Sequence, residues 1–436
     1  MRIAILWVLL GGMAAVPALA AEPDLAAADA AVRAFVAREE IPAAHVTLLR
    51  GDTVLLQRGY RTTGTGGSAP DPGSIFPLGS ISKQFTAAAI LALADEGKLR
   101  LDDPVGKYLP EWFAAEPQLK VSHLLWQTSG LADFLWLEGY RPLGDDASTP
   151  MSAYVALGAA APRRFPPGTR WSYSNTNYKA LALIAERVAG EPFDSVLAGR
   201  VLRPLGLDGI VPCHDLAPEQ LVPGVSAEGK PAPLDASRAA YAGDGGLCGT
   251  AADLQRWIRV GLAPRDGLGA RLAEPAVLAD GTEVPYGFGL STREFLGQAI
   301  VWHGGNVDSH TTQIAYLPAQ DLGLVILTSR GYVWLTEMMP ALLGIPQPAR
   351  GGPAGGRLAG RFEDGLFRYV VTPEGENLHV EIDLLGKFIF VPAGPREYVA
   401  EELPATLRIR LPADGPADRF EIDWGEVRSY ARREPE

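Results

Sequence analysis

A serine and a lysine three residues apart, Ser80 and Lys83, have the types and spacing of an acyl-transfer site. Residues i and i+3 share a helix face, so the Lys83 ammonium can reach the Ser80 hydroxyl. A serine hydroxyl is a poor nucleophile until a neighbour removes its proton. A lysine, with an ordinary pKa of about 10.4, can do this where burial or nearby charge lowers its basicity. The pattern predicts an activated serine, although a helix cap followed by a solvated lysine has the same letters.

Two later segments strengthen the catalytic interpretation. Each is a short polar motif after a Pro/Gly-rich or apolar stretch: Tyr173-Ser174-Asn175 and His303-Gly304-Gly305-Asn306. The order S-x-x-K, Y-x-N, H-x-G resembles the serine β-lactamase and penicillin-binding-protein superfamily. It is most similar to the class C β-lactamase branch, with its D-aminopeptidase-like and esterase relatives.

The resemblance extends beyond the motifs and covers about residues 25 to 335. The segments that carry it are residues 98–110, 122–131, 204–207 and 245–254. Members usually have a histidine at the position of Gln127.

The resemblance implies a role for each motif residue. Ser80 would be the acylated nucleophile, and Lys83 and Tyr173 would share the general-base task. A phenol with an ordinary pKa of about 10 can act so only near a cation such as Lys83. Tyr173 would also pass a proton to the leaving group, and Asn175 would hydrogen-bond either the Lys83 ammonium or the substrate amide.

The resemblance also implies an oxyanion hole, made by the backbone N–H groups of Ser80 and Asn306. Gly304 and Gly305 fit this, because a strand edge without side chains lets substrate backbone approach closely. We expect His303 to contact a substrate carboxylate or carbonyl, as the usual lysine of the third motif does; the alternative is that it only packs beside Trp302.

Two departures from the family pattern concern the substrate. His303 replaces lysine, which argues against efficient β-lactam hydrolysis, because the two side chains present charge differently at neutral pH. Ser309-His310 stands where relatives often carry a glycine and an aromatic residue, and either lines the acyl pocket or faces solvent.

Other chemistries fit the sequence less well. An α/β-hydrolase needs G-x-S-x-G, but the chain reads Leu78-Gly79-Ser80-Ile81-Ser82. His214-Asp215 with Glu219 lacks any H-x-x-x-H or H-E-x-x-H spacing, so we expect no metal and no cofactor.

Residues 1–20 have the pattern of a signal peptide, with Arg2, an apolar core and an A-x-A site that predicts cleavage after Ala20. A membrane anchor is the alternative, but the apolar run is short. We therefore expect a periplasmic or secreted protein. There Cys213 and Cys248 could form one disulfide, although sequence does not show whether they meet.

The chain of 436 residues predicts two domains that differ in their pattern of helix-like and strand-like segments. Residues 21–345 mix helices with strand-like runs and predict an α+β fold, with an antiparallel sheet flanked by helices plus a helical subdomain (β-lactamase-like). Residues 44–49 and 53–57 read as a hairpin. Residues 346–356 read as a linker, and residues 357–436 as a small all-β domain, either a barrel or a sandwich.

These features predict an exported serine hydrolase that cleaves esters or amides through an acyl-enzyme on Ser80, of the esterase or D-amino-acid-directed peptidase type. A β-lactamase or D,D-carboxypeptidase is one alternative, and a non-hydrolytic penicillin-binding or sensor module is another. The expected partner is a small-molecule or peptide substrate, with no stable membrane anchor. A net charge of −12 argues against nucleic acid. The oligomeric state stays open.

Overall fold

The computed structural model describes these residues: 22–62, 67–140, 149–226, 228–232, 234, 242–263, 267–284, 286–295, 298–333, 335, 338–345, 358–363, 368–382, 386–394, 397–400, 407–410, 419–424 and 428–434. The predicted signal peptide and the predicted linker at 346–356 lie outside them.

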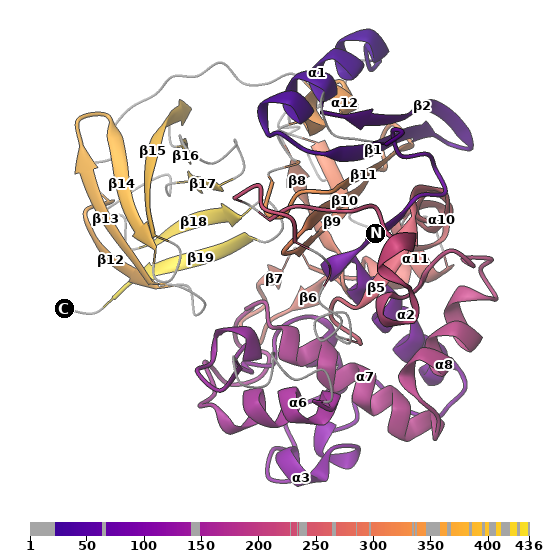
Figure 1. Cartoon of the computed structure of the whole chain (residues 1–436). Coiled ribbons are helices and arrows are strands. Elements are labelled where there is room, and N and C mark those ends of the chain that lie inside the picture. The colour runs from indigo at the N-terminus through magenta and orange to yellow at the C-terminus, as the bar shows by residue number, and fades with distance from the viewer. Residues whose placement is uncertain are drawn as a thin grey trace, which may run out of the picture.

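A six-stranded antiparallel sheet, in the order β2-β1-β11-β10-β9-β8, forms the centre of the larger part of the molecule (Figure 1). Its strands are β1 Ala43–Arg50, β2 Thr53–Arg61, β8 Ser291–Phe295, β9 Gln298–Val307, β10 His310–Leu317 and β11 Leu322–Thr328. The predicted hairpin is confirmed, since β1 pairs with β2 across a turn in which Gly51 has a φ of 55°. The sheet therefore joins strands from both ends of this part of the chain.

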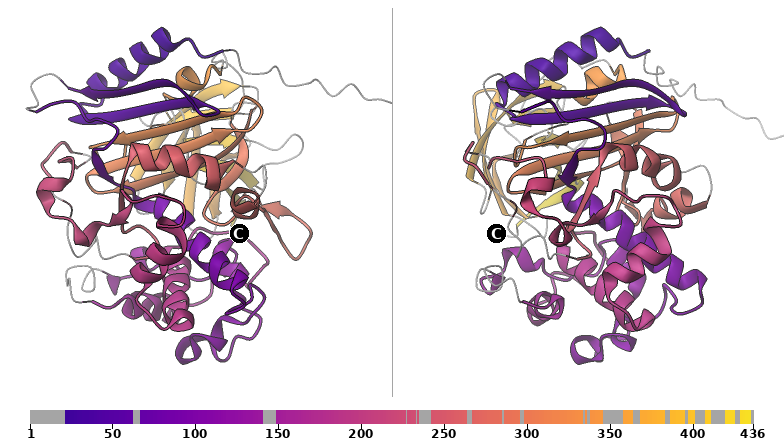
Figure 2. Two further views of the ribbon diagram at one scale, coloured as in Figure 1. Left: turned by 90° about the vertical axis from the view of Figure 1, so that its right-hand side faces the viewer. Right: turned by 45° about the vertical axis from the view of Figure 1, so that its right-hand side comes forward.

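Two helices cover one face of the sheet, and a helical region lies on the other (Figures 1 and 2). The covering helices are α1 Leu25–Arg38 and α12 Met339–Leu343. The other helices are η1 Gly79–Ile81, α2 Ser82–Asp95, η2 Val105–Lys107, α3 Pro110–Phe113, α4 Val121–Leu125, η3 Phe134–Trp136, α6 Met151–Ala160, α7 Asn175–Ala189, α8 Phe193–Leu197, η4 Ala198–Leu202, η5 Cys213–Asp215, η6 Pro218–Gln220, α10 Ala251–Trp257, η7 Ile258–Leu262 and α11 Gly267–Leu272. The chain also forms two small sheets. One contains β3 Ile75–Pro77, β4 Val211–Pro212 and β5 Leu247–Thr250, and the other contains β6 Ala276–Val277 and β7 Glu283–Val284.

Helix α2 is buried along almost its whole length. Strong helix formers such as the Ala87-Ala88-Ala89 run favour the helix, and their small side chains allow other elements to pack closely. The Phe85 ring packs against Trp257 with 4.3 Å between ring centroids, and the Trp257 indole donates to Gln84 Oε1 at 2.6 Å. The helix ends before Gly97, whose φ of 71° suits a glycine C′ residue. The S-x-x-K motif thus lies at the start of a helix that is packed into the core.

The C-terminal strands close into a barrel, in orange and yellow in Figure 1, because the last strand pairs with the first. The strands are β12 Gly360–Glu363, β13 Arg368–Glu374, β14 Asn377–Ile382, β15 Gly386–Gly394, β16 Glu397–Ala400, β17 Leu407–Arg410, β18 Arg419–Trp424 and β19 Arg428–Arg433. Alternating side chains such as Leu378, Val380 and Ile382 fill its own core. Of the two expected all-β forms, the structure has the barrel.

The predicted fold class is therefore confirmed: a β-lactamase-like sheet with a helical region, and an all-β part at the C-terminal end. Within the described ranges, no helix is both long and apolar enough to cross a membrane.

Candidate active site

Ser80 lies in η1, directly before α2, and Lys83 lies in the first turn of that helix. Lys83 Nζ is 3.0 Å from Ser80 Oγ, as the spacing predicts. Lys83 is completely buried. Burial disfavours the charged form of a lysine, and it also removes water that would compete for the serine proton.

Three oxygen atoms surround the Lys83 ammonium. Its Nζ donates to Ser80 Oγ, to Asn175 Oδ1 at 2.7 Å and to the backbone carbonyl of Asp244 at 2.6 Å. Of the two partners predicted for Asn175, the structure shows Lys83, and Asp244 is a partner that the motifs did not indicate.

Asp133 fixes the orientation of Asn175. Asn175 Nδ2 donates to Asp133 Oδ2 at 2.8 Å, so the amide oxygen is left to face Lys83. Burial raises the pKa of Asp133 to about 6, against the opposing effect of hydrogen bonds from Leu135 and Asn175 and of the Lys83 charge. Sequence reasoning missed Asp133, although it closely follows the family-like segment 122–131.

Gln127 holds the segment that carries the second motif. Its Oε1 accepts from the Ser174 backbone N–H at 3.1 Å and from Asn177 Nδ2 at 2.5 Å. Gln127 has a φ of 60°, which is uncommon for a residue other than glycine. The residue that replaces the usual histidine therefore anchors the start of α7.

Tyr173 lies beside the buried lysine. Lys83 Nζ is 4.9 Å from the centre of the Tyr173 ring, which is the nearby cation that the proposed role of this phenol requires. The ring also neighbours Tyr286 and His303, at centroid distances of 6.4 and 6.1 Å.

His303 is completely buried, and protein groups occupy both of its ring nitrogens. Nδ1 donates to the Gly304 carbonyl at 2.6 Å, so Nε2 accepts from the Tyr286 hydroxyl at 3.2 Å. Burial, and then the Lys83 charge, lower the pKa of His303 to about 3, so the ring is neutral. His303 is absent from the described residues that line the cavity at Ser80, and this position fits the alternative in which the ring only packs within the protein. Tyr286, which no motif indicated, fixes its orientation.

The backbone of β9 approaches the serine turn closely. Gly79 has a φ of 53°, and a Cβ added there would lie 2.8 Å from Asn306 N. A Cβ on Gly305 would lie 2.0 Å from the Leu78 carbonyl oxygen. The protein's own backbone therefore requires glycine at 305, a reason that the sequence did not indicate. The N–H groups of Ser80 and Asn306 belong to these two adjoining segments.

A cavity of about 190 Å³ opens at Ser80 and Asn306. This is below the ~300–1,000 Å³ of most small-molecule sites, so it suits an acyl group about one amino acid in size. Asp244 and Asp308 are the acidic residues of its wall, and among the described lining residues none is a lysine or arginine. Lys83 lies beneath the wall.

The remaining candidates are also placed. Ser309 lines this cavity and donates to His310 Nδ1 at 2.7 Å, while His310 Nε2 donates to the Val222 carbonyl at 2.9 Å, so the pair is buried and does not face solvent. Cys213 and Cys248 form a disulfide beside the cavity, with a Cα–Cα distance of 4.9 Å. Within the described residues, no cluster of three or more His, Cys, Asp or Glu side chains could hold a metal.

A serine at a cavity in contact with a buried lysine, together with the family and sequence matches below, defines a serine hydrolase. The profile of the beta-lactamase family matches residues 28–339, and the chain belongs to that family.

The relatives are similar in sequence or in fold. A D-aminopeptidase from Gluconobacter oxydans is 28% identical over 384 residues, which cover 79% of this chain and 70% of the relative. A D-aminopeptidase from Brucella ovis is 28% identical over 338 residues, covering 75% and 64%. The chain thus spans about two thirds of the length of these relatives. The octameric penicillin-binding protein homologue from Pyrococcus abyssi has a similar fold, with a TM-score of 0.63, 20% identity and coverage of 94% of this chain and all of that one.

Proposed function

We propose that this protein is an exported serine hydrolase that forms an acyl-enzyme on Ser80 and acts on amides and peptides of D-amino acids. The observation that carries the proposal is the 3.0 Å contact between Ser80 Oγ and the buried Lys83. The activity of the sequence relatives, D-aminopeptidase, supports the substrate class. Residues 1–20 and the Cys213–Cys248 disulfide support export, because disulfides persist in oxidising compartments.

The proposed reaction has two halves. Lys83 and Tyr173 accept the Ser80 proton while Oγ attacks the substrate carbonyl carbon, and the N–H groups of Ser80 and Asn306 bind the oxyanion. Tyr173 then returns the proton to the leaving amine as the C–N bond breaks. Water attacks the resulting ester and gives its proton to the same base. The base passes that proton to Ser80 Oγ as the bond between Oγ and the carbonyl carbon breaks, which releases the acid and restores Ser80.

The charge of the cavity favours an amino-terminal substrate. D,D-peptides and β-lactams present a carboxylate, which a cation in the wall would bind, and the described lining residues offer no lysine or arginine. The acidic residues in the wall instead favour a protonated amine over a carboxylate. We therefore place the free α-amino group of the acyl residue in this cavity, which distinguishes an aminopeptidase from a carboxypeptidase.

The test compares the protein without residues 1–20 with its Ser80→Ala variant on four substrates. These are D-alanine p-nitroanilide, its N-acetyl form, a p-nitrophenyl ester and nitrocefin. We expect turnover of the free-amine amide, weaker turnover of the acetylated form, and a loss of about 10⁴-fold or more in Ser80→Ala. Ser195→Ala, an exposed serine of α8, is the matched control and should retain full activity.

Three results would redirect the proposal. Hydrolysis that survives Ser80→Ala would remove Ser80 as the nucleophile. A stable acyl adduct on intact mass spectrometry, without turnover, would favour the binding or sensor module. Preference for nitrocefin or for the acetylated amide would reject the amino-terminal assignment. N-terminal sequencing of protein secreted from the full chain tests export, with Ala21 as the expected first residue.

A further inference from the structure

Helix α7 carries a second completely buried lysine, Lys179, one helical turn after Asn175. Its Nζ lies 2.8 Å from Asp244 Oδ1 and donates to the Ala242 carbonyl at 3.0 Å. The Asp244 side chain is only 6% exposed. A buried ion pair contributes little net stability, because the loss of water costs about as much as the attraction returns. Its presence beside the site therefore asks for another explanation.

Asp244 links the two buried lysines. Its backbone carbonyl accepts from Lys83 Nζ at 2.6 Å, while its carboxylate pairs with Lys179. Asp244 thus connects Lys179 to Lys83, whose Nζ contacts Ser80 Oγ.

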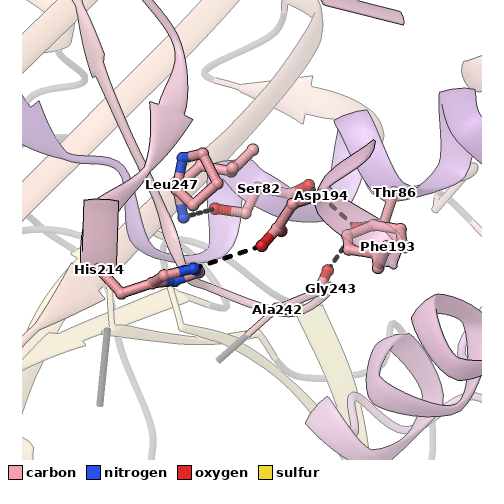
Figure 3. A pocket seen from close by; sticks show the side chains of 10 residues that line it. Ser82, Thr86, Phe193, Asp194, His214, Ala242, Gly243 and Leu247 are labelled. Carbon is pink, nitrogen blue, oxygen red and sulfur yellow. Dashed lines mark hydrogen bonds and ion pairs between the residues drawn. The ribbon is translucent and has the colours of Figure 1, made fainter. Parts of the chain in front are cut away.

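Two further hydrogen bonds tie the same segment to α2. Thr86 Oγ1 donates to the Gly243 carbonyl at 2.6 Å, and the Leu247 N–H donates to Ser82 Oγ at 3.1 Å, on either side of Asp244 (Figure 3). The segment therefore docks on the helix that carries Lys83, and Lys179 fixes the side chain in its middle.

We propose that the Lys179–Asp244 ion pair is a positioning pair, which holds the Asp244 carbonyl on Lys83 and keeps the net buried charge beside Lys83 near zero. The inference rests on the proposed function, in which Lys83 accepts the Ser80 proton. Either charge left alone would act strongly on Lys83, since no water screens it. Burial lowers the pKa of Lys179, and the Asp244 carboxylate opposes that change.

Other titratable groups face this cluster from the elements around it. They are Asp133 through Asn175, Asp194 of α8, the tyrosines Tyr154, Tyr173 and Tyr178, and His303. Asp194 also lies 3.3 Å from His214 Nε2, and this half-exposed pair borders a small cavity of about 10 Å³ (Figure 3). Two of these groups respond to the pair: the Asp244 charge raises the pKa of Asp133, and the Lys179 charge lowers that of Asp194. The variants are therefore read as a set, with opposite shifts in the two single variants and a return toward wild type in the double variant.

The test is the pH dependence of kcat/KM in Lys179→Met, Asp244→Asn and the double variant. Asp244→Asn leaves a buried cation that disfavours protonated Lys83, so the acid limb should move to lower pH by about one unit. Lys179→Met leaves a buried anion and should move that limb to higher pH by a similar amount. The double variant restores neutrality and should return toward the wild-type profile.

A purely structural pair would give a different pattern. It would lower the melting temperature in all three variants, with the acid limb unmoved or moved in one common direction, and either result would overturn the proposal. Glu116→Gln is the matched control, because it breaks a partly buried ion pair with Arg163 outside the site and should leave the profile unchanged. Lys179→Gln replaces Lys179→Met if the latter does not fold.

A second readout separates this inference from the substrate assignment. The rate at which a fluorophosphonate labels Ser80 reports the same deprotonation without any natural substrate. If the amides are not hydrolysed but labelling shows opposite shifts in the two single variants, the positioning pair stands and the substrate assignment falls. If labelling is unshifted, the positioning pair falls.

Discussion

The substitution Gly79→Ala tests whether the serine turn and β9 form the oxyanion hole together. Gly79 has a φ of 53°, and an alanine there costs about 1–2 kcal/mol in backbone strain. The new Cβ would also lie 2.8 Å from Asn306 N, 3.0 Å from Gly305 C and 3.1 Å from Asn306 O. All three atoms are backbone, so the strand itself must move by some tenths of an ångström, and the Asn306 N–H moves with it.

We expect a loss of kcat much larger than the loss of stability. Removal of one oxyanion donor typically costs about 100- to 1,000-fold in rate, so a displaced donor should cost about 100-fold. Gly97→Ala supplies the control, because Gly97 has a similar φ of 71° and an added Cβ would meet nothing within 4 Å. Backbone strain should destabilise both variants by similar amounts, and only Gly79→Ala should lose activity.

The assay is kcat on the best p-nitroanilide or p-nitrophenyl substrate, with thermal unfolding of both variants. If Gly79→Ala retained kcat within about threefold of wild type, or lost no more than Gly97→Ala, the contact with Asn306 would not shape the oxyanion hole.

Three more predictions concern pH, the Asp133 contact and the disulfide. Burial lowers the pKa of His45 and of His310 to about 4, so the unfolded chain takes up protons first as the pH falls. The free energy of unfolding should therefore decrease between pH 6.5 and pH 4, by about 2–3 kcal/mol for each ring. An unfolding midpoint that does not change over this range would contradict the prediction. Asp133, with a pKa raised to about 6, offsets part of that loss. Asp133→Asn should lower kcat/KM about 10-fold or more through misorientation of its partner amide, and equal activity in steady-state assays would exclude this contact from the mechanism. Replacement of Cys213 and Cys248 by serine should lower the free energy of unfolding by about 3–4 kcal/mol, from a separation of 35 residues, whereas identical denaturant midpoints would refute it.

Sequence reasoning succeeded where the deciding contacts are local. The Ser80–Lys83 contact follows from helix geometry, and the first hairpin follows from two apolar runs around Gly51. The alternating C-terminal segments predicted an all-β part, but closure needs the pairing of β12 with β19, which short-range patterns do not encode.

The same reasoning failed where distant segments meet. Asp244 reaches Lys83 across 161 positions, and the Asp133–Asn175 contact spans 42. Neither residue has a spacing that marks it, because its role comes from tertiary packing. The need for glycine at 305 was missed in part for the same cause, since only the folded chain brings Leu78 against it.

The burial of Lys83 and Lys179 has a practical consequence for surface chemistry. Both amines are enclosed, whereas Lys98, Lys107 and Lys120 are 40 to 53% exposed. Amine-reactive dyes, cross-linkers and activated resins will therefore couple to the exposed lysines and spare the two that surround Asp244. The enzyme can be immobilised or labelled through its amines without modification of the two lysines that we propose act at Ser80.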